Sequence, residues 1–239
     1  MPYSALSSVY DRFVGADYDA ITALVASILN AFDVKGKVLD VACGTGELTS
    51  RLKASGLEVS GTDASDEMLE IAKAKCNAYF FKSDMCSLPQ KCEFEACVCT
   101  LDSLNHLNGK DSLRQAFESI NGVLKPGGVF IFDMNTLFKH REILADNTFV
   151  YEDESSYIVW QNSAADDGRV DISLDIFSKL EEGNYKRQTE SFSEYAYELS
   201  VLKDMLTDAE FEIVDISSGF EMEEIDDECE RYFFIVRKI

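Results

Sequence analysis

The chain has 239 residues, which is enough for one α/β domain with a substantial core. Its formal net charge of −22 and sequence pI near 4.3 give a surface that repels phosphate groups. This balance argues against DNA, RNA and anionic membranes as partners, and no apolar run approaches the length of a membrane span.

The cysteines argue against a metal centre. There are seven, an odd number, no Cys-x-x-Cys pair occurs, and the chain has only two histidines. We therefore expect no metal ion and a reducing, cytoplasmic compartment. Charged residues within the first twenty positions, Asp11 and Arg12 among them, are not typical of a secretory signal.

The N-terminal region is too apolar for a free tail. Tyr3, Val9, Tyr10, Phe13 and Tyr18 lie within its first eighteen residues. We therefore do not expect this region to be a free tail.

Residues 37–48 predict a strand, a glycine turn and the start of a helix. Val38, Leu39 and Val41 form the short apolar run of a buried strand. Gly44 and Gly46 then allow a tight turn and a close approach of the backbone to a ligand. The helix that follows is expected to end near Gly56. Nucleotide-like ligands bind at such turns, beyond the carboxyl ends of parallel strands.

Two further strands are expected to end in acids. Residues 58–63 end at Asp63, and residues 78–85 contain Asp84 near the end of the strand. An acid about 20 residues beyond the glycine turn is placed to accept ribose hydroxyls. Between these strands, residues 64–72 predict a helix with Ser65 or Asp66 as its N-cap.

The middle of the chain continues the alternation of strands and helices. Residues 94–99 predict a fourth strand, and Cys97 and Cys99 share one of its faces as small core residues. A loop over 100–107 precedes a helix over 111–124 with apolar residues at helical spacing. The sequence Leu-Lys-Pro-Gly-Gly at 124–128 predicts a turn into a fifth strand over 129–133.

These segments together resemble the class I S-adenosylmethionine-dependent methyltransferases. Asp40, Ala42, Gly44 and Gly46 match the family motif D/E-x-G-x-G-x-G, with alanine in place of the first glycine. The D-x-S-x-x-M-L segment from Asp63 and the Leu-Lys-Pro-Gly-Gly step also match in order. The resemblance implies a Rossmann-like three-layer α/β/α fold, with a mostly parallel seven-stranded sheet and an antiparallel β insertion.

The resemblance also implies S-adenosyl-L-methionine as the cofactor. In the family, an acid at the position of Asp63 accepts the ribose hydroxyls, and a residue at the position of Met68 would lie against the adenine. An acid at the position of Asp84 accepts the adenine amino group, and the backbone N–H of the next residue contacts the ring. The residues expected to bind the cofactor are Asp40, Ala42, Gly44, Gly46, Asp63, Ala64, Met68, Asp84, Met85, Leu101 and Asp102. Two simpler interpretations stay open. The aspartates could only cap turns, and Met68 could be a core residue.

The second half predicts an antiparallel unit. Val170, Ile172, Leu174 and Ile176 alternate with polar residues, as in a strand with one buried face. Further strands are expected near 149–151, 157–160, 188–197, 211–216 and 232–236, with a helix over 199–206. We divide the single domain into a lid with the first helix (1–34), a cofactor-binding core (35–144), a β-rich substrate insertion (145–197) and a completion of the core (198–239).

Tyr10 and His106 are the candidate catalytic residues. The "YD…DY" string from Tyr10 to Tyr18 resembles the lid of small-molecule methyltransferases, in which a tyrosine approaches the sulfonium or the acceptor amine. Tyr10 is the first candidate and Tyr18 the second, although both rings could merely pack the lid. His106 follows the fourth strand, near the expected methyl group, and could serve as a base or could pack the loop. We assign His140 no role.

The favoured function is methyl transfer to a small molecule, to nitrogen before oxygen, in a monomer or homodimer. The lid and loop resemble those of aminosugar N-methyltransferases. One alternative is a non-catalytic S-adenosylmethionine-binding regulatory protein. The other is a nicotinamide-dependent oxidoreductase, which is disfavoured because Thr49 stands where a dinucleotide fingerprint has its third small residue.

Overall fold

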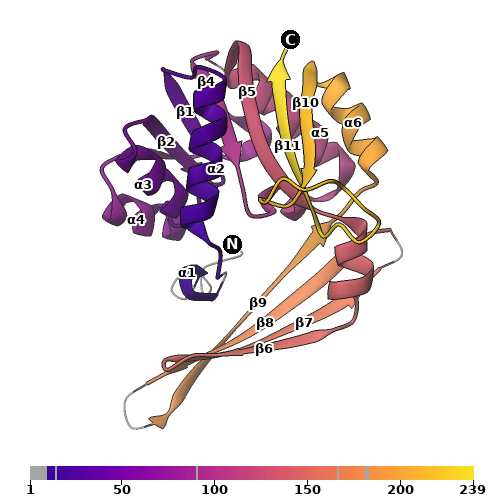
Figure 1. The fold of residues 1–239 in the computed structure, drawn as a ribbon. Helices are drawn as coiled ribbons and strands as arrows, with labels where there is room; N and C mark the ends of the chain where they lie inside the picture. The colour runs from indigo at the N-terminus through magenta and orange to yellow at the C-terminus, as the bar shows by residue number, and fades with distance from the viewer. Residues whose placement is uncertain (1–9, 14, 90, 166, 181–182) are drawn as a thin grey trace.

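A computed structural model describes residues 10–13, 15–89, 91–165, 167–180 and 183–239, without the side chains of Tyr10 and Arg12. The chain forms a seven-stranded sheet covered by helices and a separate four-stranded sheet (Figure 1). Among the residues that the structure describes, no helix is long and apolar enough to span a membrane.

The larger sheet has the strand order β10-β11-β5-β4-β1-β2-β3. Only β11 runs in the direction opposite to the other six strands, so the sheet is mostly parallel, as predicted. Its strands and the helices of this layer are β1 (Lys37–Val41), β2 (Glu58–Asp63), β3 (Tyr79–Lys82), β4 (Phe94–Cys99), β5 (Leu124–Asn135), β10 (Phe211–Ser218), β11 (Arg231–Lys238), α2 (Tyr18–Ala31), α3 (Glu47–Ala54), α4 (Asp66–Lys75), α5 (Gly109–Val123) and α6 (Leu199–Asp208).

The sheet separates two hydrophobic cores, which is why its central strands are apolar on both faces. Phe117 of α5 packs with Phe132 and Phe234 on one face. Val25 of α2 and Leu52 of α3 belong to the core on the other face. The central strand β1 is therefore almost wholly buried, and the parallel strands present their carboxyl ends at one edge of the sheet.

Several local predictions are confirmed. Cys97 and Cys99 are both fully buried in β4, and Gly56 follows the C-cap of α3 with φ +96°. Ser65 is the N-cap of α4, and its hydroxyl accepts from the Met68 N–H at 3.2 Å. One detail differs. The step at 124–128, predicted as a turn, is the first part of β5, where the pairing with β4 shifts register between Phe94 and Ala96.

The second sheet consists of β6 (Thr148–Glu152), β7 (Ser156–Ala164), β8 (Arg169–Lys179) and β9 (Tyr185–Tyr195), paired antiparallel in that order. We call it the roof sheet because it faces the carboxyl ends of the parallel strands (Figure 1). The alternation in β8 is confirmed, since Val170, Ile172, Leu174 and Ile176 are buried on one face. A π-helix, η4 (Lys139–Leu144), precedes the roof sheet.

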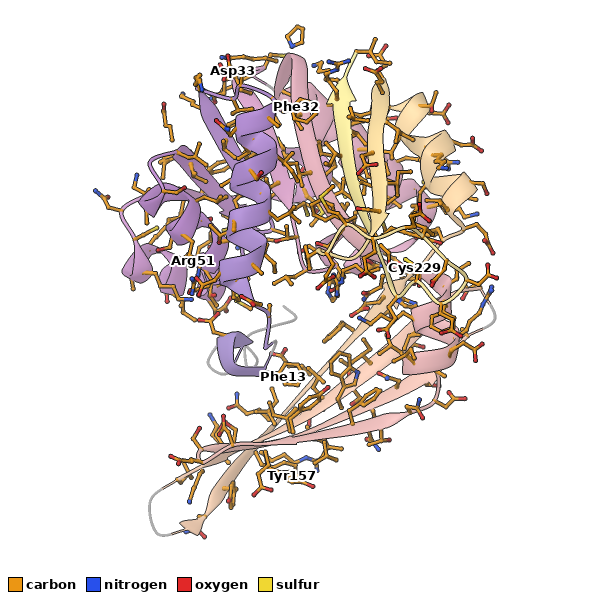
Figure 2. The ribbon with its side chains drawn as sticks, in the orientation of Figure 1. Phe13, Phe32, Asp33, Arg51, Tyr157 and Cys229 are labelled. Carbon is orange, nitrogen blue, oxygen red and sulfur yellow. The ribbon has the colours of Figure 1, made fainter. Side chains whose placement is uncertain are left out.

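The short helix α1 (Tyr10–Phe13) lies between the core and the roof sheet (Figure 1). The Phe13 ring contacts Tyr151 edge-on at 5.1 Å and Trp160 at 5.6 Å between ring centroids. Figure 2 shows Phe13 directed toward the roof sheet, with Tyr157 on that sheet's opposite face. This helix is the described part of the predicted lid.

Candidate active site

The glycine turn after β1 is built from backbone of positive φ. Ala42 has φ +55°, Gly44 +53° and Gly46 +75°. A Cβ on Gly46 would lie 2.8 Å from the Ala72 Cβ of α4, so glycine is needed there for the packing of α3 against α4. Ala42 adopts the left-handed conformation despite its methyl group. The backbone of the turn at Ala42 and Gly44 thus lines the neighbouring cavity described next.

That first cavity has a volume of about 370 Å³ and lies at the carboxyl ends of β1, β2 and β4. It is lined by most of the residues expected to bind the cofactor: Ala42, Gly44, Asp63, Ala64, Met68, Asp84, Met85 and Leu101, together with Val41, Thr62, Ser65, Ser83, Ser103, His106 and Leu107. Three expected residues, Asp40, Gly46 and Asp102, do not line it. The binding roles of all these residues stay predictions.

Asp63 joins the glycine turn to the end of β2. Its Oδ2 accepts from the Gly44 N–H at 2.9 Å, and its Oδ1 accepts from the Ser65 N–H at 2.8 Å. Burial raises the pKa of this carboxyl. Each oxygen of a carboxylate can accept more than one hydrogen bond, so Asp63 can still accept hydroxyls from a ligand in the cavity.

Asp40 supports the turn from within the protein. It is 2% exposed and accepts from the Thr49 hydroxyl of α3. Burial raises the pKa of Asp40 to about 7, against the opposing effect of that hydrogen bond. Its contacts fix the start of α3 relative to β1.

Asp84 caps the short helix η2 (Met85–Ser87) and accepts from the Cys86 N–H through Oδ1 at 2.8 Å. Asp84 and the neighbouring Met85 both line the first cavity. Met68 is 3% exposed and lines the same cavity, so it contributes both to the core and to the cavity wall.

A second cavity of about 780 Å³ lies between the core and the roof sheet. Leu101 and His106 line both cavities, so the two meet at these residues. Six of its lining residues are aromatic: Phe13, Phe149, Tyr151, Trp160, Phe192 and Phe220. The cavity is also lined by four ionisable residues, Asp102, Lys139, Glu194 and Arg231. A pocket with an apolar side and a few convergent polar groups is typical of a small-molecule site.

The loop after β4 has strained backbone held by buried charges. Leu101 and Asp102 have φ of +59° and +51°, which L residues rarely adopt. Asp133 of β5 accepts from their N–H groups at 2.7 and 2.9 Å. Arg231 of β11 donates to Asp133 and, at 2.8 Å, to Asp102 Oδ1. Burial alone would raise the pKa of Asp102, but the Arg231 guanidinium and the other positive charges nearby together outweigh burial, so the pKa is lowered.

His106 ends the helix η3 (Ser103–His106) after this loop. Its ring packs edge-on against Phe192 with centroids 5.2 Å apart, and its Nε2 lies 3.8 Å from Glu194 Oε1 of β9. The structure therefore brings the candidate base to a carboxylate from the roof sheet.

Asp102, His106 and Glu194 offer ligand atoms that lie within 4.8 Å of one another. Two neighbouring cations oppose a metal ion here. Arg231 already holds one oxygen of Asp102, and Lys139 interacts electrostatically with both carboxylates. Burial lowers the pKa of Lys139, and Arg231 lowers it further. The expectation of no metal stays a prediction.

The sequence comparisons agree with this architecture. Residues 38–128 match the family described as "Methyltransferase domain". The protein named "Putative methyltransferase YqeM" of Bacillus subtilis (strain 168) is 34% identical over 245 residues, spanning 100% of this chain and 98% of that protein. This chain belongs to the class I S-adenosylmethionine-dependent methyltransferases.

Other comparisons support the fold and the cofactor. A crystal structure of an S-adenosylmethionine-dependent methyltransferase from Clostridium acetobutylicum ATCC 824 superposes with a TM-score of 0.90 at 29% identity, covering 99% of this methyltransferase and 98% of that chain. An amino pentose methyltransferase from Micromonospora echinaspora has the same fold, with a TM-score of 0.78 at 16% identity, covering 100% and 98% of the two chains. A dTDP-amino-sugar N,N-dimethyltransferase from Streptomyces fradiae is 32% identical over 121 residues, about half of each chain.

The first cavity of this methyltransferase fits the adenosine part of its cofactor. Asp63 and Asp84 provide acceptors for hydroxyl and amino groups, and Met68, Met85 and Leu107 provide an apolar surface for a flat ring. The glycine turn adds backbone with no bulky side chain at Gly44. We call this space the cofactor cavity and the second one the acceptor cavity.

The two lid tyrosines have different outcomes. Tyr10 begins α1, but its side chain lies outside the described residues, so its catalytic role stays a prediction. Tyr18 packs beside the core of α2 and does not line either cavity. Burial and the nearby Asp11 raise the pKa of its hydroxyl.

Sequence reasoning missed Glu194, Arg231 and His140. Arg231 lies 129 residues from its partner Asp102, and no local sequence motif predicts a pair so far apart. His140 comes close to Glu194 only through the fold. The sequence contains a weak signal for Glu194. It lies on the buried face of a strand whose residues alternate between a more buried and a more exposed face.

Proposed function

We propose that this methyltransferase transfers the methyl group of S-adenosylmethionine to an amine nitrogen of a small molecule, with His106 as the base. The observation that carries the proposal is that His106 lines both the cofactor cavity and the acceptor cavity. A group at that junction is placed to meet a nucleophile that approaches the methyl group.

The lining of the acceptor cavity supports an amine. Asp102 and Glu194 lie near His106, and Asp17 and Glu221 also line the cavity. Carboxylates attract and orient a protonated amine before it loses its proton. The aromatic residues offer apolar surface, and their ring faces can also attract a cation. The names of an amino pentose methyltransferase and an amino-sugar dimethyltransferase among the similar proteins point in the same direction.

The proposed chemistry needs few protein groups. The bound cofactor supplies a methyl group already activated on a sulfonium. His106 takes the proton from the acceptor nitrogen, whose lone pair forms the new N–C bond as the S–C bond breaks. Asp63 and Asp84 hold the adenosine end, and the helix α1 and the roof sheet exclude water from the junction. Alignment of the reacting atoms supplies the main part of the acceleration.

Calorimetric titration with S-adenosylhomocysteine, S-adenosylmethionine and NAD tests the cofactor part of the proposal. We expect saturable binding of the first two and none of NAD. Amines are then screened for release of S-adenosylhomocysteine, and His106→Asn should retain cofactor binding while turnover falls by about 10²-fold or more. Turnover of alcohols but not amines, or full turnover by the variant, would contradict the proposal.

We also infer a reducing, cytoplasmic compartment. All seven cysteines, which lie within the described residues, carry free thiols. Disulfide-free proteins with several cysteines are typical of such compartments.

A further inference from the structure

Both histidines of the chain lie against one carboxylate. His106 and His140 are the only two histidines among its 239 residues. Glu194 Oε1 is 3.8 Å from His106 Nε2, and Glu194 Oε2 is 3.6 Å from His140 Nε2. Glu194 and His140 are 3% and 1% exposed, so water screens this contact poorly.

The hydrogen bond at the other nitrogen of His140 defines where its protons lie. His140 Nδ1 is 2.8 Å from the Gly168 carbonyl oxygen, which can only accept, so Nδ1 carries a proton. Nε2 is buried and has no hydrogen-bond partner among the described residues. A neutral His140 would therefore direct an unpaired lone pair at the Glu194 carboxylate, which costs energy in a buried site.

A second proton on Nε2 removes this conflict, and the surrounding charges favour it. The carboxylates of Asp102, Asp133 and Glu194 outnumber the cations of Arg231 and Lys139 by one. Glu230 also faces Lys139, but it is exposed to solvent. A charged His140 balances the buried groups. Between Glu194 and His140, the proton is expected on His140 and the negative charge on Glu194, because the Asn135 amide donates to Glu194 Oε2 at 3.2 Å.

We propose that Glu194 is a positioning residue that holds His140 as a buried imidazolium and fixes the proton of neutral His106 on Nε2. The lone pair of His106 is then on Nδ1, which is the nitrogen that would accept the proton of the acceptor. The part that Glu194 plays in methyl transfer rests on the proposed function. The position of the protons does not depend on it.

Nitrogen NMR of the protein with ¹⁵N-labelled histidine tests the proposal without an acceptor. Because the chain has only two histidines, the spectrum of His106→Asn contains the signals of His140 only, and this assigns both rings. At neutral pH we expect both nitrogens of His140 to be protonated in the otherwise native protein, and His106 to show the Nε2–H tautomer. A neutral His140, or the Nδ1–H tautomer of His106, would overturn the proposal.

Glu194→Gln should remove the second proton of His140, because the amide can donate to Nε2 and carries no charge. The matched control is Glu190→Gln, which changes the other buried glutamate on the same face of β9 and should leave both rings as they were. An unchanged His140 in Glu194→Gln contradicts the proposal. Histidine signals that change when a chelator is added to the purified protein also contradict it, since they indicate a metal ion on Asp102, His106 and Glu194.

Titration of each variant with S-adenosylhomocysteine shows separately that it is folded and binds cofactor. A protein with the expected proton positions and no methyl transfer to amines would overturn the proposed acceptor but not the role of Glu194. If Glu194→Gln does not fold, the proton positions of both rings in the otherwise native protein, assigned with the His106→Asn variant, decide the question.

Discussion

Asp63 is the residue with the most direct expected effect on cofactor binding. Asp63→Asn keeps the size of the side chain but replaces one acceptor oxygen with a donor, opposite the Gly44 or Ser65 N–H. Hydrogen bonds to a charged group contribute about 1.5–3 kcal/mol, so affinity for S-adenosylhomocysteine should fall by roughly 10- to 100-fold. Calorimetry measures this effect.

The matched control for Asp63 is Asp66→Asn. Asp66 is an acid three positions later at the start of α4, pairs with Lys82 on the surface and does not line the cofactor cavity. Its removal should leave affinity within about twofold, as for surface changes elsewhere. Equal affinities of the Asp63 variant and the native protein would remove Asp63 from the binding site.

Asp40 should make stability depend on pH in a defined direction. Its pKa is about 7 in the folded protein, above the value of 3.8 for a free aspartate. Between pH about 4 and about 7 the unfolded chain releases this proton while the folded protein retains it. Stability supplied by the protonated carboxyl is therefore present below pH 4 and is lost as pH rises through 7, by about 4 kcal/mol at most.

The variant Asp40→Asn stays neutral and should not lose that stability. Urea unfolding of both proteins at several values between pH 4 and pH 8 measures the difference between them, in which the other titrating groups cancel. The unfolding free energy of the variant minus that of the native protein should become more positive as pH rises. A difference that stays constant, or that grows as pH falls, would contradict a raised pKa for Asp40.

At the scale of elements, the packing of α3 on α4 depends on Gly46. Its φ of +75° costs an L residue about 1–2 kcal/mol, and a Cβ would also meet Ala72 at 2.8 Å. Overpacking of this kind costs a further 1–3 kcal/mol, roughly. Gly46→Ala should therefore lower the free energy of unfolding by about 2–5 kcal/mol, as measured in denaturant.

Gly127 in β5 offers a close control, because its φ is +76° and a Cβ there would have no atom within 4 Å. Gly127→Ala therefore incurs the backbone cost alone. The two variants together isolate the contact with Ala72. Equal losses of stability would mean that α3 and α4 can separate enough to accept a methyl group.

The contrast between the two halves of the site explains what the sequence could predict. The cofactor cavity is built by local segments, each a strand followed by its turn, so motifs near Gly44, Asp63 and Asp84 predict its lining. The acceptor cavity is built by the roof sheet, η4 and the start of β11. Alternation predicted which face of β8 is buried, but it contains no information on what that face covers. Glu194 and Arg231 meet the site only through tertiary packing.

At the scale of the whole molecule, α1 connects the glycine turn to the roof sheet. Asp11 accepts hydrogen bonds from the Thr45 hydroxyl in the glycine turn and from Lys75 of α4. On its other side, Phe13 packs on Tyr151 and Trp160. A change at the turn can therefore reach the acceptor cavity through a four-residue helix.

Trp160 reports on this connection, because it is the only tryptophan of the chain. Saturating S-adenosylhomocysteine should change the emission of Trp160, since ligand at the turn repositions α1 and with it the ring of Phe13. Phe13→Ala should abolish most of that change while cofactor affinity, measured by calorimetry, stays within a few-fold of native. Tyr157→Ala, on the opposite face of the roof sheet, should leave the response intact (Figure 2). Trp160 emission that does not change when ligand binds, or a change that persists in Phe13→Ala, would mean that the glycine turn and the roof sheet act independently.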